Sequence, residues 1–138
     1  MSNPLLQLDP TQTPGHPTLE ETAAWAATWH AGQTDTAGGP QVAHLIRVQR
    51  LLLRLFPRAT GVERHAAWLH DVLRDTPLTP SDLRGRGYAP EVIALLEALP
   101  QTPEPDASGI APLATRGPRS ALRVKIADLT DLCDLTGG

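Results

Sequence analysis

The segment TGVERHAAWLHDVLRDT (residues 60–76) combines the start of a helix with two adjacent residues of types that bind metals. Thr60 and Glu63 match a capping box, in which each side chain accepts a hydrogen bond from a backbone N–H at the helix start. No helix breaker follows until the proline just beyond the segment. The pattern therefore predicts one helix over residues 60–76, and that helix carries the neighbouring side chains of His70 and Asp71.

The segments on either side of residues 60–76 indicate five more helices. Apolar residues recur at helical spacing in them, and capping residues, prolines or glycines stand at their ends. The predicted helices cover residues 18–30, 42–56, 80–85 (or to 87), 91–99 and 120–135. No segment shows the pattern of a strand, so the predicted fold class is all-α, a helical bundle.

Proline-rich stretches indicate where the chain leaves the helical domain. Residues 1–17 contain four prolines among polar residues, a composition that disfavours helix and sheet, and we predict a flexible N-terminal arm there. Residues 100–118 are also rich in breakers and are predicted to form a long loop. A chain of 138 residues with 41% hydrophobic residues supports one folded domain, which we place at residues 18–138.

Composition restricts the classes of function. The formal net charge of −3 argues against a surface that neutralises a nucleic-acid backbone. Cys133 is the single cysteine, so neither an internal disulfide nor a thiolate zinc site is expected. The chain has no apolar run of membrane-spanning length and no signal-peptide pattern at its start. We therefore expect a cytoplasmic protein that acts on a small molecule, with no membrane or nucleic-acid partner, and the oligomeric state is open.

Four potential metal ligands lie on three of the predicted helices. His70 and Asp71 are on the helix of residues 60–76, His44 is on the preceding long helix and Asp128 is on the last one. A compact bundle could bring all four to one point. Two imidazoles and two carboxylates suit manganese, iron or magnesium. A metal of this kind lowers the pKa of bound water and polarises a phosphoryl oxygen, so hydrolysis of a phosphate ester or anhydride is the predicted reaction.

Five sequence motifs occur in an order that resembles a known family. They are HAGQ (30–33), GGPQVAH (38–44), AAWLHDVLRDT (66–76), DLRGRGYAPEV (82–92) and ALRVKIADL (121–129). Together they resemble the HD hydrolase domain of the RelA/SpoT alarmone enzymes, over about residues 19–132.

This resemblance implies an HD-domain helical bundle that uses manganese, with Fe²⁺ or Mg²⁺ as alternatives. It also implies removal of pyrophosphate from the 3′ position of guanosine tetraphosphate (ppGpp) or pentaphosphate. By motif position, the family's metal ligands correspond to His44, His70, Asp71 and Asp128.

The chain departs from the family's pattern beside these ligands. The Glu-Asp pair usual within the HD motif is replaced by Arg74-Asp75. Asp75 could assist a metal-activated water, and Arg74 could contact a substrate phosphate, so both are candidate catalytic residues. An exposed Arg74 paired with a nearby acid is the alternative. Residues 34–37 lack the family's basic character, and Gln41 and Leu132 stand where the family has an aromatic residue and an asparagine.

Other charged residues are open to two interpretations. Arg47, Arg50 and Arg54 fall three and four residues apart, which is more typical of a solvated helix face than of an anion site. Lys125, three residues before Asp128, either reaches a phosphate or stays solvated.

Three functional hypotheses follow from these observations. The first is an HD phosphohydrolase that acts on a nucleotide pyrophosphate such as ppGpp. The second is an HD phosphomonoesterase or phosphodiesterase with another substrate, suggested by the missing basic and aromatic pocket residues. The third is a non-catalytic metal-binding or sensing module, suggested by Arg74 in place of a carboxylate.

Overall fold

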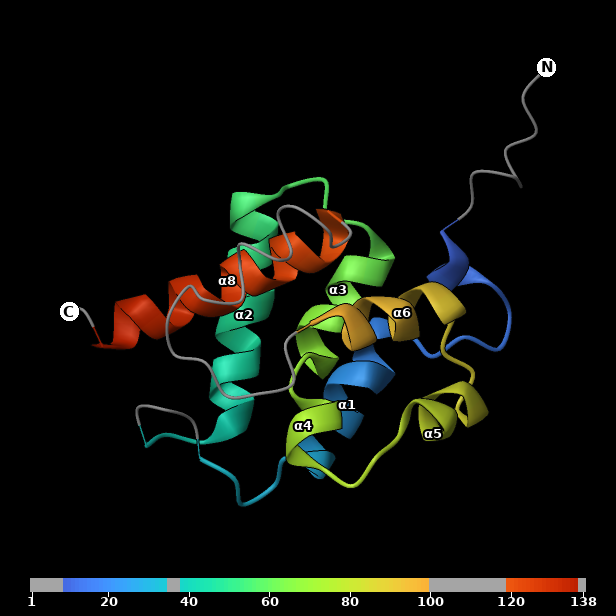
Figure 1. Cartoon of the computed structure of the whole chain (residues 1–138), viewed down its shortest axis with the longest axis horizontal. Helices are drawn as coiled ribbons and strands as arrows, with labels where there is room; N and C mark the ends of the chain where they lie inside the picture. Colours follow the sequence, from blue (N-terminus) through green and yellow to red (C-terminus); the bar gives the residue numbers. More distant parts are fainter. Residues whose placement is uncertain (1–8, 35–37, 100–118, 137–138) are drawn as a thin grey trace.

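The computed structural model of the chain describes residues 9–34, 38–99 and 119–136, with side chains in the last segment described as far as Asp131 (Figure 1). Within these ranges the chain forms helices and no strand, apart from one isolated bridge between Thr34 and Pro40. The predicted all-α class is therefore confirmed. The loop predicted at residues 100–118 lies outside the described residues.

Five of the six predicted helices are present with ends that agree to within a few residues, and the sixth, over residues 60–76, is divided into two helices. The elements are the 3₁₀ helix η2 (Pro10–Gln12) and the α-helices α1 (Leu19–Trp29), α2 (Gln41–Leu55), α3 (Gly61–Leu69), α4 (Val72–Asp75), α5 (Pro80–Gly85), α6 (Pro90–Ala98) and α8 (Arg119–Thr136). Complete capping boxes begin α1 at Thr18 and α3 at Thr60, as the sequence predicted. The sequence predicts these two helix starts correctly because a capping box is formed by residues only three positions apart.

The prediction of one continuous helix over residues 60–76 is wrong. Helix α3 ends at Leu69, His70 and Asp71 form a turn, and α4 starts again at Val72. No proline or glycine marks this break in the sequence. At this turn His70 Nε2 lies 3.2 Å from Asp71 Oδ2, so the two adjacent side chains approach each other.

Helix α3 lies at the centre of the bundle and packs against α1, α2, α6 and α8 (Figure 1). Its residues Ala66 and Leu69 join the main hydrophobic core, to which α6 and α8 also contribute. A second core cluster, which includes Val48, Leu52 and Ala127, lies where α8 crosses α2. The crossing of α2 and α8 beside α3 brings the three segments that carry the predicted ligands together. Among the helices described, none combines the length and the apolar character needed to cross a membrane.

The prediction of a loose arm does not hold for residues 9–17, while residues 1–8 lie outside the described part of the chain. Asp9 caps η2 and accepts a hydrogen bond at 2.7 Å from the backbone N–H of Gly61, at the start of α3. A methyl group on Gly61 would overlap the side chains of Asp9 and Thr11. The His16 ring lies edge-on against the ring of His65 on α3, with their centroids 5.0 Å apart. This part of the arm is therefore packed onto α3.

Candidate metal centre

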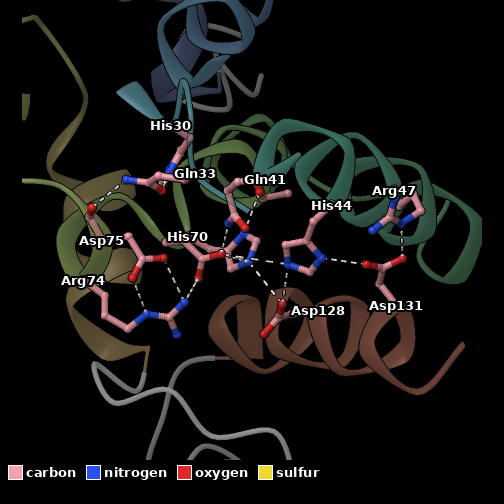
Figure 2. Close-up of polar contacts among 12 residues, drawn as sticks. His30, Gln33, Gln41, His44, Arg47, His70, Arg74, Asp75, Asp128 and Asp131 are labelled. Carbon is pink, nitrogen blue, oxygen red and sulfur yellow. Dashed lines mark hydrogen bonds and ion pairs between the residues drawn. The ribbon is translucent and has the colours of Figure 1, made fainter. Parts of the chain in front are cut away.

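Three segments of the bundle bring four side chains to one point. His44 comes from α2, His70 and Asp71 from the turn between α3 and α4, and Asp128 from α8. His44 Nε2 lies 2.9 Å from Asp128 Oδ1. His70 Nε2 lies 3.2 Å from the same oxygen. Asp71 Oδ2 lies 3.2 Å from His70 Nε2 and 3.9 Å from His44 Nε2. The four side chains predicted as metal ligands therefore lie close together, and Figure 2 shows His44, His70 and Asp128 among them.

The spacing of these atoms matches what a single ion requires. Ligand atoms at about 2.0 to 2.3 Å from one ion stand no more than about 4.6 Å apart. His44, His70 and Asp128 each offer an atom within 4.8 Å of the others. The separations from Asp71 to the two histidines, 3.2 and 3.9 Å, fall in the same range. His44, His70 and Asp128 could thus hold a metal ion with two nitrogen ligands and one oxygen ligand, and Asp71 stands beside them as the fourth predicted ligand.

The electrostatics of the cluster favour a positive charge at its centre. Burial by itself raises the pKa of both carboxyl groups, yet the neighbouring His70 imidazole lowers the pKa of Asp71 and of Asp128 far below the usual range. Burial also lowers the pKa of His70, but Asp71 and Asp128 together raise it well above its ordinary value. Two buried carboxylates therefore favour a positive charge between them, which a proton on His70 or a bound cation can supply.

Two further buried side chains hold the predicted ligands, and sequence reasoning did not find either role. Gln41 Nε2 donates to Asp71 Oδ2 at 2.6 Å, at the position where the family resemblance leads one to expect an aromatic residue. Asp131 Oδ2 lies 2.6 Å from His44 Nδ1, on the side of the ring away from the cluster. Asp131 follows Asp128 by three residues, and that helical spacing was the signal that could have revealed it.

Two cations lie beside the cluster and line a pocket with it. Arg74 Nη2 lies 3.0 Å from Asp71 Oδ1, and Lys125 Nζ lies 3.5 Å from Asp128 Oδ2. Both cations share the pocket lining with His70, Asp71 and Asp128. Lys125 is only 6% exposed, so the interpretation of a solvated lysine is wrong.

The candidate catalytic pair Arg74 and Asp75 is joined in an ion pair. Arg74 donates from Nε to Asp75 Oδ1 at 2.9 Å and from Nη2 to Asp75 Oδ2 at 3.0 Å. Hydrogen bonding to Asp75 raises the pKa of Arg74, with Asp71 and Asp128 acting in the same direction. Arg74 is thus an exposed residue paired with nearby acids, as the alternative interpretation has it, and these pairs hold it beside the cluster while both oxygens of Asp75 accept from it.

The HAGQ motif contacts the pair of Arg74 and Asp75 through the backbone carbonyl of Asp75. His30 is the C-cap of α1, and its Nδ1 lies 2.6 Å from Gln33 Oε1. Gln33 Nε2 then donates to the backbone carbonyl of Asp75 at 2.9 Å. These contacts tie the connection between α1 and α2 to the end of α4, where Arg74 and Asp75 lie (Figure 2).

Among the remaining residues, the three arginines predicted to form one solvated face are divided. Arg50 and Arg54 are exposed, whereas Arg47 Nε donates at 2.7 Å to Asp131 Oδ1, and that carboxylate is buried. The side chains of Leu132 and Cys133 lie outside those that the structure describes. The sequence of the chain matches no protein-family model and no curated protein.

Proposed function

We propose that this protein is a metal-dependent phosphohydrolase of the HD type that acts on a nucleotide pyrophosphate such as ppGpp. The observation that carries the proposal is the convergence of His44, His70, Asp71 and Asp128 from three separate segments, with neighbouring donor atoms 2.9 to 3.9 Å apart. Two imidazoles and two carboxylates form a donor set that suits Mn²⁺, with Fe²⁺ and Mg²⁺ as alternatives.

A bound divalent ion would supply the chemistry of phosphate hydrolysis, namely a water of lowered pKa and a positive charge against a phosphoryl oxygen. The side chains of the chain hold that ion and leave the pocket beside it for the substrate, since His70, Asp71 and Asp128 line the pocket.

Arg74 and Lys125 supply the contacts to the substrate's phosphates in this proposal. In the structure both cations lie against Asp71 and Asp128, the two carboxylates that would bind the ion. With a divalent ion bound, Asp71 and Asp128 would be neutralised, so the charge of Lys125 would no longer be offset by Asp128 and would favour an oxyanion ligand, while Arg74 would keep its pair with Asp75. A guanidinium suits this role because it presents several N–H donors in a fixed plane. Asp75 contributes by fixing the position of Arg74.

The choice of a nucleotide pyrophosphate rests on the sequence motifs. HAGQ, the HD pair and the final KIAD segment stand in the order that resembles the RelA/SpoT hydrolase domain. The pocket lining of His70, two carboxylates and two cations does not by itself select among phosphate esters and anhydrides. The substrate test therefore has to include simpler nucleotides.

A second candidate is a metal-binding module without turnover. It is favoured by one observation, because both carboxylate oxygens of Asp75 accept hydrogen bonds from Arg74. A carboxylate held in this way is a poor base for an attacking water. Under this alternative, the metal and an anion bind but no phosphate is released.

The two candidates are separated by metal analysis followed by an assay. The protein purified without chelator should contain close to one transition-metal ion per chain. With added Mn²⁺ it should release pyrophosphate from ppGpp, and a panel of nucleoside di- and triphosphates, monophosphates and cyclic nucleotides tests the other ester classes. Metal binding without any hydrolysis supports the module, and absence of metal binding rules out both.

A further inference from the structure

Helices α2 and α8 face each other through two successive pairs of side chains at the metal centre. His44 and Arg47 lie one turn apart on α2, and Asp128 and Asp131 lie one turn apart on α8. His44 Nε2 meets Asp128 Oδ1 at 2.9 Å, and Arg47 Nε donates to Asp131 Oδ1 at 2.7 Å. Asp131 also reaches back to His44, so the two pairs form one connected network (Figure 2).

The two ring nitrogens of His44 have different surroundings. Nε2 points to the cluster with Asp71 and Asp128, and Nδ1 lies 2.6 Å from Asp131 Oδ2. A deprotonated carboxylate can only accept a hydrogen bond. The hydrogen bond to Asp131 therefore requires a proton on Nδ1. Nε2 faces Asp128 Oδ1 at 2.9 Å, and a metal ion would take the place of the proton on Nε2, so the metal-binding ring is the one that keeps its proton on Nδ1.

The surroundings of Asp131 keep it in position as an acceptor. Its side chain is 3% exposed, and that of His44 is 4% exposed, so water competes little for this hydrogen bond. Arg47 donates to the second oxygen of Asp131 from a side chain that is 34% exposed. The guanidinium supplies the charge that a buried carboxylate requires and fixes the plane of the carboxylate.

We propose that Asp131, held by Arg47, is a positioning residue that orients His44 and selects its metal-binding tautomer. This inference rests on the proposed metal centre and assigns a role to a residue that is not a ligand in it. Carboxylates that accept a hydrogen bond from a metal-binding histidine increase metal affinity, and their removal typically costs about 10- to 100-fold.

Three variants of the full chain test this role. Asp131→Asn keeps the shape of the side chain and removes its charge. Arg47→Gln keeps Asp131 and removes the guanidinium that pairs with it. Glu63→Gln is the matched control, because Glu63 is likewise a buried carboxylate next to an arginine, Arg123 at 3.4 Å, but contacts none of the four ligands in the described structure.

Two measurements distinguish positioning from a purely structural role. The first is Mn²⁺ affinity by titration, compared with thermal stability in the absence of metal. The second is ¹⁵N NMR of the histidine rings with Zn²⁺ as a diamagnetic probe, which shows which nitrogen of His44 carries a proton and how strongly that proton is hydrogen bonded.

We expect a 10- to 100-fold loss of Mn²⁺ affinity in Asp131→Asn and a smaller loss in Arg47→Gln. The wild-type protein should show a strongly hydrogen-bonded proton on His44 Nδ1, and its signal should shift or disappear in Asp131→Asn. Glu63→Gln should lower thermal stability and keep the wild-type affinity for Mn²⁺.

Wild-type Mn²⁺ affinity in a folded Asp131→Asn, or an equal loss of affinity in Glu63→Gln, would overturn the inference. If Asp131→Asn does not fold, the Mn²⁺ affinity and the Nδ1 proton signal of Arg47→Gln test the inference in its place. A wild-type protein that binds no metal would refute the metal centre itself, whereas metal binding without hydrolysis would leave the role of Asp131 intact.

Discussion

The guanidinium of Arg74 lies against the carboxylate of Asp71, with Nη2 and Oδ1 3.0 Å apart. Asp71 is at the same time 3.2 Å from His70, so a cation stands directly beside the proposed metal centre where the resembled family has an acidic residue. This contact excludes an Arg74 that points away into solvent. A substitution of Arg74 therefore tests whether the pocket binds a phosphate.

Replacing Arg74 should weaken both substrate binding and turnover. With saturating Mn²⁺, Arg74→Gln should lower kcat/KM about 10- to 100-fold, which corresponds to one hydrogen bond to a charged group at about 1.5 to 3 kcal/mol. Arg74→Glu should lower it further, since a negative charge would face the substrate's phosphates. Arg123→Gln is a suitable control, because its side chain has the same exposure of 28% and pairs with Glu63 instead. A rise in activity in Arg74→Glu would instead indicate that the enzyme lacks a water-activating carboxylate.

Removing one carboxylate from the cluster should abolish metal binding. In Asp71→Ala the centre loses a ligand and its contact with both histidines, and we expect metal content near zero by elemental analysis after dialysis. Asp82→Ala serves as the control, since Asp82 is an exposed carboxylate that caps α5. Full metal content in Asp71→Ala would show that the ion binds elsewhere.

His65 should make the stability of the fold depend on pH. Burial, with His16 acting in the same direction, lowers the pKa of His65 from 6.5 to about 4. Between pH 6.5 and 4 the unfolded chain binds a proton that the folded chain excludes, so the free energy of unfolding decreases as the pH falls through this window. The decrease is about 2 kcal/mol when solvent screening of part of the shift is allowed for.

The variant His65→Asn tests this dependence. An asparagine can keep a hydrogen bond to Thr22, whose Oγ1 lies 2.8 Å from His65 Nδ1, but it does not titrate. The difference in unfolding free energy between pH 7 and pH 4.5 should be smaller in the variant than in the wild-type protein. Parallel pH profiles from urea titrations would contradict the prediction. Because His65 lies outside the metal cluster, the experiment is performed without added metal.

The packing of the N-terminal arm is tested at Gly61. A methyl group there would overlap Asp9 and Thr11, so Gly61→Ala should destabilise the protein by about 1 to 3 kcal/mol and make the arm more sensitive to protease. At Gly85 on α5 an added methyl group meets nothing within 4 Å, so Gly85→Ala should be neutral or slightly stabilising. Equal stability of the two variants in urea denaturation would mean that residues 9–17 do not pack on α3 in solution.

The helices themselves could be predicted from the sequence because their signals are local. The capping boxes at Thr18 and Thr60 define their helix starts within three residues of chain. The four candidate ligands were also identified from the sequence, since residue type and order along the chain were sufficient to select them. Their convergence at one point depended on the bundle, and the structure shows it.

Contacts between distant segments were decided only by the tertiary structure. The break at His70 and Asp71 has no proline or glycine to announce it, and it occurs where the turn allows both side chains to face α2 and α8. The pairing of Asp131 with His44 joins residues 87 positions apart, and the packing of Asp9 on α3 joins residues 52 positions apart. Helix propensity and capping are properties of short stretches of sequence, whereas the partner of a buried charged group depends on which helices pack together. The sequence alone therefore determined the helices and the candidate ligands, and the packing of α2, α3 and α8 determined which side chains hold those ligands in place.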